Sequence, residues 1–133
     1  MTSLKFEDFI DLFAPYPLPH DARSRLLTRI QATPQPDEDL IIRYLEAPLG
    51  FAGSQFYVDQ FMQGELVEPI EYRSDGDWCW SNALAYYVQR YHFKISFDFA
   101  QHIKHRNGIA PTRGEIDWNR VEREFFRGAE GVS

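Results

Sequence analysis

The chain has 133 residues, of which 44% are hydrophobic and 16% aromatic, and its formal net charge is −6. This length fits one domain with one continuous core, and the apolar content is too high for an intrinsically disordered protein. No stretch approaches the roughly 20 apolar residues of a membrane-spanning helix, and the acidic N-terminus lacks the positive charge of a secretory signal. We therefore expect a single-domain, soluble, cytoplasmic protein without a membrane partner.

The negative charge is concentrated in the middle of the chain. Between Pro36 and Asp77 there are ten acids against only Arg43 and Arg73, so this window carries −8. Such a surface repels phosphate backbones, which disfavours direct nucleic-acid binding, whereas a basic protein partner would be attracted and steered toward it. Solubility alone would also explain the acids.

Three helices are predicted in the N-terminal part, residues 1–47. The segments Leu4–Phe13, Asp21–Ala32 and Asp37–Glu46 each place apolar residues at helical spacing and are followed by helix breakers. Residues 48–68 show no dominant period. They are predicted to form an irregular acidic and aromatic loop, with a possible short strand at Gln55–Val58.

A hairpin and further helices are predicted over residues 69–127. Ile70–Ser74 and Asp77–Trp80 flank Asp75-Gly76, a dipeptide that tolerates the positive φ of a two-residue type I′ turn. Strand alternation then puts Trp78 and Trp80 on one face and Cys79 on the other.

Three capped helices are predicted to follow the hairpin. Ser81 is expected to begin the first, and Ser96 the second, which should end at Asn107-Gly108. The last is predicted from about Gly114 to Phe126, with either Thr112 and Glu115 or Asp117 as its cap, and residues 128–133 are predicted to fray. The expected fold class is α+β, mainly helical, with about five to six helices and one small antiparallel β-hairpin.

The single cysteine excludes a disulfide framework and a multi-cysteine zinc site. Trp78-Cys79-Trp80 before a helix start resembles the nucleophile region of papain-like cysteine proteases, and His92, His102 or His105 could supply a base. The hairpin pattern, however, places Cys79 inside a strand, and the segments after it indicate helices rather than strands that could carry the histidine. We favour a buried, unreactive cysteine and keep a cysteine-dependent hydrolase as the alternative.

Metal binding has little support. His102 and His105 lie three apart on a predicted helix, but two imidazoles alone do not make a metal site. Asp75 and Asp77 are explained by the turn, because the alternating acids of a calcium loop are absent. We predict no metal, no cofactor and no catalytic residue.

The most specific pattern lies between Asp75 and Tyr91. Asp75-Gly76-x-Trp78-x-Trp80, followed by Leu84, Tyr86-Tyr87-Val88 and Tyr91, resembles the form TDGxWxWP and LxYYVxxY of immunity proteins from bacterial polymorphic-toxin and contact-dependent growth inhibition systems. The run Ile42-Arg43-Tyr44-Leu45 resembles a helix that precedes this form, whereas Ser74, Cys79 and Ser81 depart from it. The resemblance implies a non-enzymatic antitoxin that binds a cognate toxin domain, often a nuclease, and blocks its active site or its target binding.

The aromatic pattern itself is predicted to be structural, packing the hairpin on its helix through Gly76, Trp78, Trp80, Leu84, Tyr87, Val88 and Tyr91. Partner contact is expected instead from the acidic segment 59–77, with the candidate residues Asp59, Glu65, Glu68, Glu71, Asp75 and Asp77. An acidic adaptor or regulatory subunit without a toxin remains the other alternative, and the pattern leaves the oligomeric state open.

Overall fold

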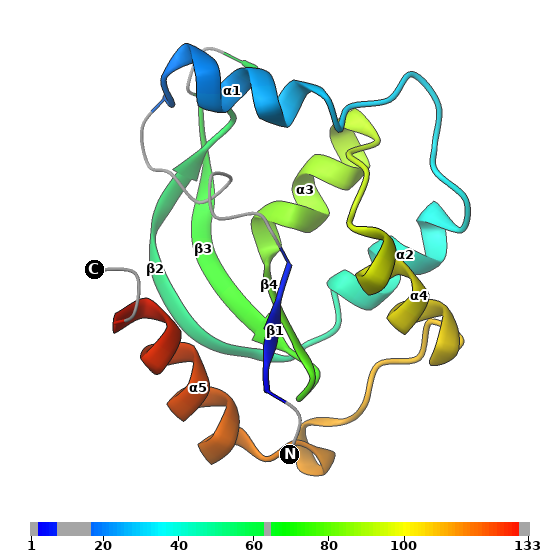
Figure 1. The fold of residues 1–133 in the computed structure, drawn as a ribbon, viewed down its shortest axis with the longest axis vertical. Coiled ribbons are helices and arrows are strands. Elements are labelled where there is room, and N and C mark those ends of the chain that lie inside the picture. The colour runs from blue at the N-terminus through cyan, green and yellow to red at the C-terminus, as the bar shows by residue number, and fades with distance from the viewer. Residues whose placement is uncertain (1–2, 8–16, 63–64, 131–133) are drawn as a thin grey trace.

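The computed structural model describes residues 3–7, 17–62 and 65–130. Within these ranges it has five α-helices and four strands (Figure 1), in the order β1 (Lys5–Phe6), α1 (His20–Leu27), α2 (Glu38–Leu45), β2 (Gly50–Val58), β3 (Leu66–Ser74), β4 (Trp78–Ser81), α3 (Asn82–Tyr91), α4 (Phe97–His105) and α5 (Trp118–Glu130). The described strands form one sheet in the order β1-β4-β3-β2. The α+β class is confirmed, but the sheet is larger than the single hairpin that was predicted, so the protein is not mainly helical.

The predicted hairpin is present as β3 and β4, but its turn is longer than predicted. Three residues, Asp75 to Asp77, separate β3 from β4, the Asp75 amide donates to the Trp78 carbonyl at 3.3 Å, and within this loop only Gly76 has a positive φ, of 99°. A two-residue type I′ turn is therefore wrong. The Asp75 Oδ1 atom accepts hydrogen bonds from the amides of Asp77 and Trp78 instead, so a side chain rather than a tight backbone turn closes this loop.

Strand β2 replaces most of the irregular loop predicted for residues 48–68. It runs antiparallel to β3, with register shifts between Gly50 and Ala52, between Gly53 and Phe56, and between Tyr57 and Val58. Each shift changes which face the next side chain occupies, so the strand shows no period of two in the sequence. The possible strand predicted at Gln55–Val58 is the last part of β2, whereas residues 50–54 were not predicted as a strand because bulges removed the alternation.

The first predicted helix is wrong over the part of Leu4–Phe13 that the structure describes. Lys5 and Phe6 form β1, which pairs in parallel with Trp78 and Cys79 of β4. The Lys5 amide donates to the Asp77 carbonyl at 2.9 Å, and the Glu7 amide donates to the Cys79 carbonyl at 3.1 Å. Pairing with a distant strand thus overrides the local helical spacing, and residues 8–13 lie outside the described ranges.

Helices α2, α3 and α4 confirm the predicted elements. The Ser81 hydroxyl accepts from the Ala83 amide at the start of α3, and the Ser96 hydroxyl accepts from the Phe99 amide at the start of α4. Helix α1 ends at Leu27, before the predicted Ala32, because the next residues pair with residues 91–94, including a 2.7 Å bond from the Lys94 amide to the Arg29 carbonyl.

Both predicted caps of the last helix are used, one after the other. The Thr112 and Glu115 side chains form a capping box at a 3₁₀ turn, Arg113–Glu115. The Asp117 carboxylate then accepts from the Arg120 amide at 3.2 Å in the first turn of α5. Helix α5 extends to Glu130, past the predicted start of a frayed tail at residue 128; residues 131–133 lie outside the described ranges.

The two faces of the sheet are covered by different helices. On β3, Tyr72 packs against Phe125 of α5, with 4.9 Å between ring centroids, whereas its neighbour Arg73 reaches the Leu45 carbonyl at the end of α2. Consecutive strand residues point to opposite faces, so α5 lies on one face and α2 on the other. The largest fully buried side chains include Trp80, Tyr44, Tyr57, Tyr87, Phe93 and Phe99.

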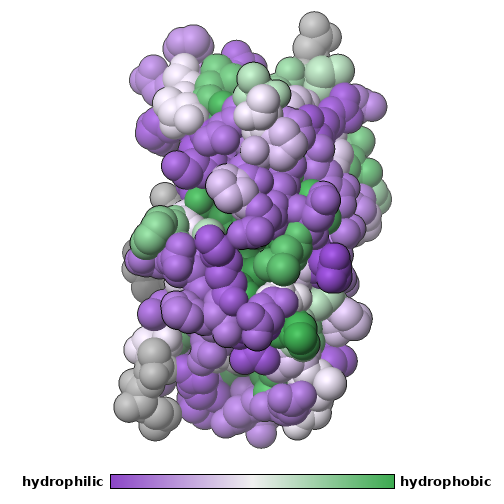
Figure 2. Space-filling view, turned by 90° about the vertical axis from the view of Figure 1, so that its right-hand side faces the viewer, coloured by the Kyte–Doolittle hydropathy of each residue, from purple (hydrophilic) through white to green (hydrophobic). Residues whose placement is uncertain are grey.

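The side of the molecule that carries α2 and α4 is mostly hydrophilic, with small separate hydrophobic patches (Figure 2). Among the described helices, none combines the length and the apolar character required to cross a membrane.

Gly108, just beyond α4, provides a test of this packing. Its φ is 69°, and a Cβ atom built on it would lie 2.3 Å from the Leu40 Cγ atom of α2. In Gly108→Ala, the alanine would have to adopt a left-handed backbone conformation, and its Cβ atom would overpack against Leu40. The free energy of unfolding should therefore fall by about 2–4 kcal/mol. Chemical denaturation followed by circular dichroism measures this.

Gly114→Ala is the matched control, because a Cβ at Gly114 meets nothing within 4 Å and its φ is not in the left-handed region. Its stability should stay within about 0.5 kcal/mol of the parent protein. Equal stability of the two variants would contradict the described contact between α2 and the end of α4.

Candidate functional site

The Asp75 carboxylate lies at the junction of the hairpin with α2 and α4. Its Oδ1 atom accepts from two amides of its own loop, at 2.9 and 2.8 Å. Its Oδ2 atom accepts from the Tyr44 hydroxyl of α2 at 2.5 Å and contacts the His102 Nε2 atom of α4 at 2.7 Å. An ionised carboxylate only accepts, so Nε2 carries the proton in this pair. One buried side chain therefore joins three separate segments of the chain.

The pKa of Asp75 reflects this environment. Burial alone would raise the pKa, but the hydrogen bonds from His102, from Tyr44 and from the two amides outweigh it and hold the pKa below the ordinary value of 3.8. The pKa of the Tyr44 hydroxyl is raised, chiefly by burial and then by the negative charge of Asp75. Asp75 thus stays ionised and Tyr44 stays protonated at neutral pH.

Asp75, Asp77 and His102 together form a group whose ligand atoms all lie within 4.8 Å of one another, as in a metal site. Both oxygens of Asp75, however, are already occupied by two donors each. The Arg106 charge also acts on the neighbouring Tyr44. A cation would have to displace protein donors beside a guanidinium, so these residues suit a structural junction better than a metal centre.

The tryptophans of the pattern support the same junction. Trp78 stacks on Phe99 of α4, with centroids 4.8 Å apart and planes at 19°. The Trp80 indole donates to the Leu45 carbonyl at 3.0 Å, at the end of α2, where helix carbonyls lack intrahelical partners. Trp78, Trp80, Leu84, Tyr87 and Val88 are all buried, and Tyr91 is half-buried. Most side chains of the pattern therefore pack in the interior of the domain.

Asp59 is also in the interior, which removes it from the expected partner surface. Its side chain is fully buried, and its Oδ2 atom accepts from the hydroxyls of Tyr86 and Tyr91 at 2.6 and 2.7 Å. The Arg90 Nε atom lies 3.9 Å from the same oxygen. Asp75 is excluded for the same reason. Sequence spacing could not reveal either role, because both depend on residues 27 to 32 positions away.

Four of the six candidate partner-contacting residues are exposed: Glu65, Glu68, Glu71 and Asp77. Glu65 directly precedes β3, Glu68 and Glu71 lie on that strand, and Asp77 lies in the hairpin loop. The structure thus brings three of these acids along one strand, next to the edge strand β2.

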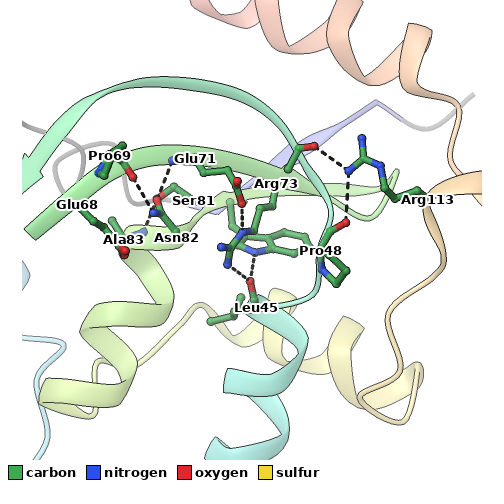
Figure 3. A network of polar contacts seen from close by, with 12 residues as sticks. Leu45, Pro48, Glu68, Pro69, Glu71, Arg73, Ser81, Asn82, Ala83 and Arg113 are labelled. Carbon is green, nitrogen blue, oxygen red and sulfur yellow. Dashed lines mark hydrogen bonds and ion pairs between the residues drawn. The ribbon is translucent and has the colours of Figure 1, made fainter.

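A groove of about 920 Å³ opens beside these acids, lined by Gly50, Phe51, Ala52, Gly53, Glu68, Pro69, Ile70, Glu71, Arg73, Asn82, Arg113, Trp118 and Glu122. Its two arginines are engaged internally (Figure 3). Arg73 contacts the Glu71 carboxylate and the Leu45 carbonyl, each at 2.7 Å. Arg113 donates to the Pro48 and Gly50 carbonyls and lies over the Trp118 ring at 4.5 Å. These guanidinium groups brace the groove wall.

Asn82 closes the inner end of this network. Its amide oxygen accepts from the Glu71 amide at 2.8 Å, and its amide nitrogen donates to the Pro69 carbonyl at 2.9 Å (Figure 3). The chain leaves β4 and enters α3 at this residue, so the Asn82 side chain supplies the hydrogen bonds that a longer β4 would have made to β3. The Asn82 side chain thus joins the start of α3 to β3 beside the exposed acids.

Cys79 lies in the middle of the sheet, paired with Ser74 on β3 and with Phe6 on β1. Its side chain is buried, and burial followed by the charge of Asp75 raises the pKa of the thiol above its ordinary value. The candidate bases are occupied or exposed: His92 contacts Glu38 at 2.7 Å, His102 contacts Asp75, and His105 is exposed on α4. This geometry argues against a thiolate nucleophile.

Comparisons with protein-family models, with curated proteins and with solved structures find no match.

Asp75→Asn tests the junction. The asparagine amide keeps the shape of the side chain but removes the negative charge to which His102 and Tyr44 donate hydrogen bonds. We therefore expect the free energy of unfolding at pH 7 to fall by about 2–4 kcal/mol. Asp77→Asn, two residues away and exposed, should change it by less than about 0.5 kcal/mol. The two variants are compared by chemical denaturation.

The stability difference between the parent protein and Asp75→Asn should also depend on pH. Because the folded pKa of Asp75 lies below 3.8, its contribution is fully present well above that pH and is lost as the pH falls through the folded value. The difference should stay constant between pH 7 and about pH 5 and shrink at lower pH. A difference that grew on acidification would contradict an ionised Asp75.

Cys79 should be unreactive in the native protein. Iodoacetamide at pH 7.5 should label it at least about 100-fold more slowly in buffer than in denaturant, because the buried thiol carries almost no thiolate. Intact-protein mass spectrometry follows the reaction. Rapid labelling of Cys79 in the native protein would contradict its burial and would support the cysteine-dependent hydrolase hypothesis.

Proposed function

We propose that this protein is an immunity protein that binds a cognate bacterial toxin domain, a basic nuclease, and covers its active site or its target-binding surface. The observation that carries the proposal is the set of exposed carboxylates Glu65, Glu68 and Glu71 at and along β3. The proposal also places the protein in the cytoplasm, because a nuclease toxin reaches its nucleic-acid target there and has to be bound there.

The distribution of the acids supports a binding surface. Within the acidic window, Glu38, Asp59 and Asp75 are buried with hydroxyl or imidazole partners, and the other seven acids are exposed. The buried three serve the fold. Of the exposed seven, Glu71 pairs with Arg73, Asp37 pairs with Lys104, and Glu68 accepts a hydrogen bond from the Tyr57 hydroxyl. Their remaining negative field would attract a basic partner and speed its association, which matters when the partner damages the cell.

The resemblance of residues 75–91 to immunity proteins supports the same proposal from the sequence. Its aromatic residues pack the hairpin against α2, α3 and α4, whereas Glu65, Glu68 and Glu71 at and along β3 stay exposed. A protein that acts by covering a partner needs such a rigid frame behind a variable polar surface. Burial of Cys79 weighs against the hydrolase alternative.

Co-expression tests the proposal. The protein should restore growth to cells that produce the toxin domain encoded by the gene immediately upstream, and the two chains should co-purify. An adaptor without a toxin partner would bind another protein but give no rescue. Failure of both rescue and complex formation would end the proposal.

The exposed acids should set the strength and the rate of association. Glu65→Gln combined with Glu68→Gln should raise the dissociation constant of the complex by about 5- to 10-fold, mainly by slowing association, since charge complementarity acts on encounter. The effect should shrink in 0.5 M salt, where the Debye length falls to about 4 Å. Surface plasmon resonance at two salt concentrations measures both quantities.

Asp39→Asn combined with Glu46→Gln is the matched control, because it removes the same charge from exposed positions on and just after α2. It should change the dissociation constant by less than about twofold, as expected for charges outside a contact surface. Equal effects of the two pairs would show that net charge alone acts and that the β3 acids are not the contact surface.

A further inference from the structure

Strand β2 is an open edge of the sheet. It is the last strand in the order β1-β4-β3-β2, and no strand pairs with its outer side among residues 3–7, 17–62 and 65–130 (Figure 1). An open edge offers unpaired amide and carbonyl groups to any extended chain. The edge strand β1, at the other end of the sheet, has only two residues and includes Lys5.

Strand β2 lacks the usual protections of such an edge. Its nine residues, GFAGSQFYV, include no charged residue and no proline. Most natural edge strands are short, or carry lysine or proline, to prevent pairing with other chains. The register shifts along β2, and the Arg113 guanidinium that occupies the Gly50 carbonyl, protect only part of it. A long, uncharged open edge on a folded domain suits the addition of a strand from a partner.

The surroundings of β2 define the chemistry of that strand. Phe56 and Leu66 are 50% and 64% exposed, and both lie near the end of the sheet where β2 and β3 approach their connecting loop, Phe56 opposite Pro69 and Leu66 opposite Val58. Glu65, Glu68 and Glu71 lie beside them on or next to β3, and Glu122 of α5 lines the adjoining groove. An added strand with alternating apolar and basic side chains would cover the two apolar residues and meet the carboxylates.

The groove leaves room for such side chains. A Cβ atom at Gly50 would lie 2.5 Å from the Glu71 carboxyl carbon, so glycine lets the carboxylate lie against the strand. Phe51 and Trp118 supply aromatic surface, with centroids 5.8 Å apart. Arg73 already pairs with Glu71, and Arg113 already lies over the Trp118 ring, so the carboxylates left for an added basic side chain are those of Glu68 and Glu122.

We propose that the outer edge of β2 accepts an extended, basic segment of the toxin domain as an additional strand. This proposal rests on the immunity function proposed above and assigns its contact surface. A second copy of this chain fits less well. Strand β2 has no basic residue, so a second copy paired along it would bring no cation to the exposed Glu65 and Glu68 carboxylates, whereas a basic segment would.

Hydrogen–deuterium exchange of the complex with the toxin domain encoded immediately upstream tests the assignment. Backbone amides between Gly50 and Val58 should exchange at least tenfold more slowly in the complex than in the free protein. Leu66→Lys and Phe56→Lys should each raise the dissociation constant by at least tenfold. The control, Ile109→Lys, changes a residue that is 68% exposed on the loop after α4 and should leave the constant within twofold.

The outcomes separate the two proposals. A stable complex with protection confined to another surface, such as α2 and α4, would overturn the strand addition and leave the immunity function standing. The absence of any complex would overturn both. A dimer of the free protein that Leu66→Lys dissociates would show a second copy on this edge and would also overturn the assignment.

Discussion

The carboxylate of Asp75 accepts four hydrogen bonds from three segments of the chain, two from its own loop and one each from Tyr44 and His102. It closes the three-residue hairpin loop, and it fixes the hairpin against α2 and α4. A buried charge is tolerated only when its partners are complete, because each missing partner leaves a desolvated charge behind. The packing of Trp78 on Phe99, and the cap that Trp80 places on α2, both depend on this arrangement.

Local signals explain which parts of the fold could be predicted. The caps Ser81 and Ser96 and the helical spacing after each involve neighbours in sequence, so α3 and α4 were predicted correctly. Only the Gln55–Val58 part of β2 was predicted, as a possible strand, because bulges disturb the alternation, and β1 was missed because the strand that pairs with it is distant in sequence. The burial of Asp59 could not be predicted either, since its hydroxyl partners lie on α3 and nothing near it in sequence indicates them.

The structure separates the residues that hold the fold from those that remain free to bind. The pattern at residues 75–91 resembles immunity proteins through its aromatic residues. Three of these, Trp78, Trp80 and Tyr87, are buried and form part of the core. The acids beside it divide into two groups: buried ones that accept hydroxyl or imidazole hydrogen bonds, and exposed ones on or beside β3. The function that we propose therefore depends on the exposed acids and on the uncharged edge of β2, where charge attraction and strand pairing can act together.

The ionisation of Asp75 in the folded protein is the property on which this account depends most. Carbon-detected NMR of the aspartate carboxyl carbons, recorded across an acid titration of the folded protein, measures it at the atom concerned. The account predicts a midpoint for Asp75 below the ordinary aspartate value of 3.8. A midpoint at or above that value would contradict it, because the carboxyl group would then be protonated too readily to accept four hydrogen bonds as an anion.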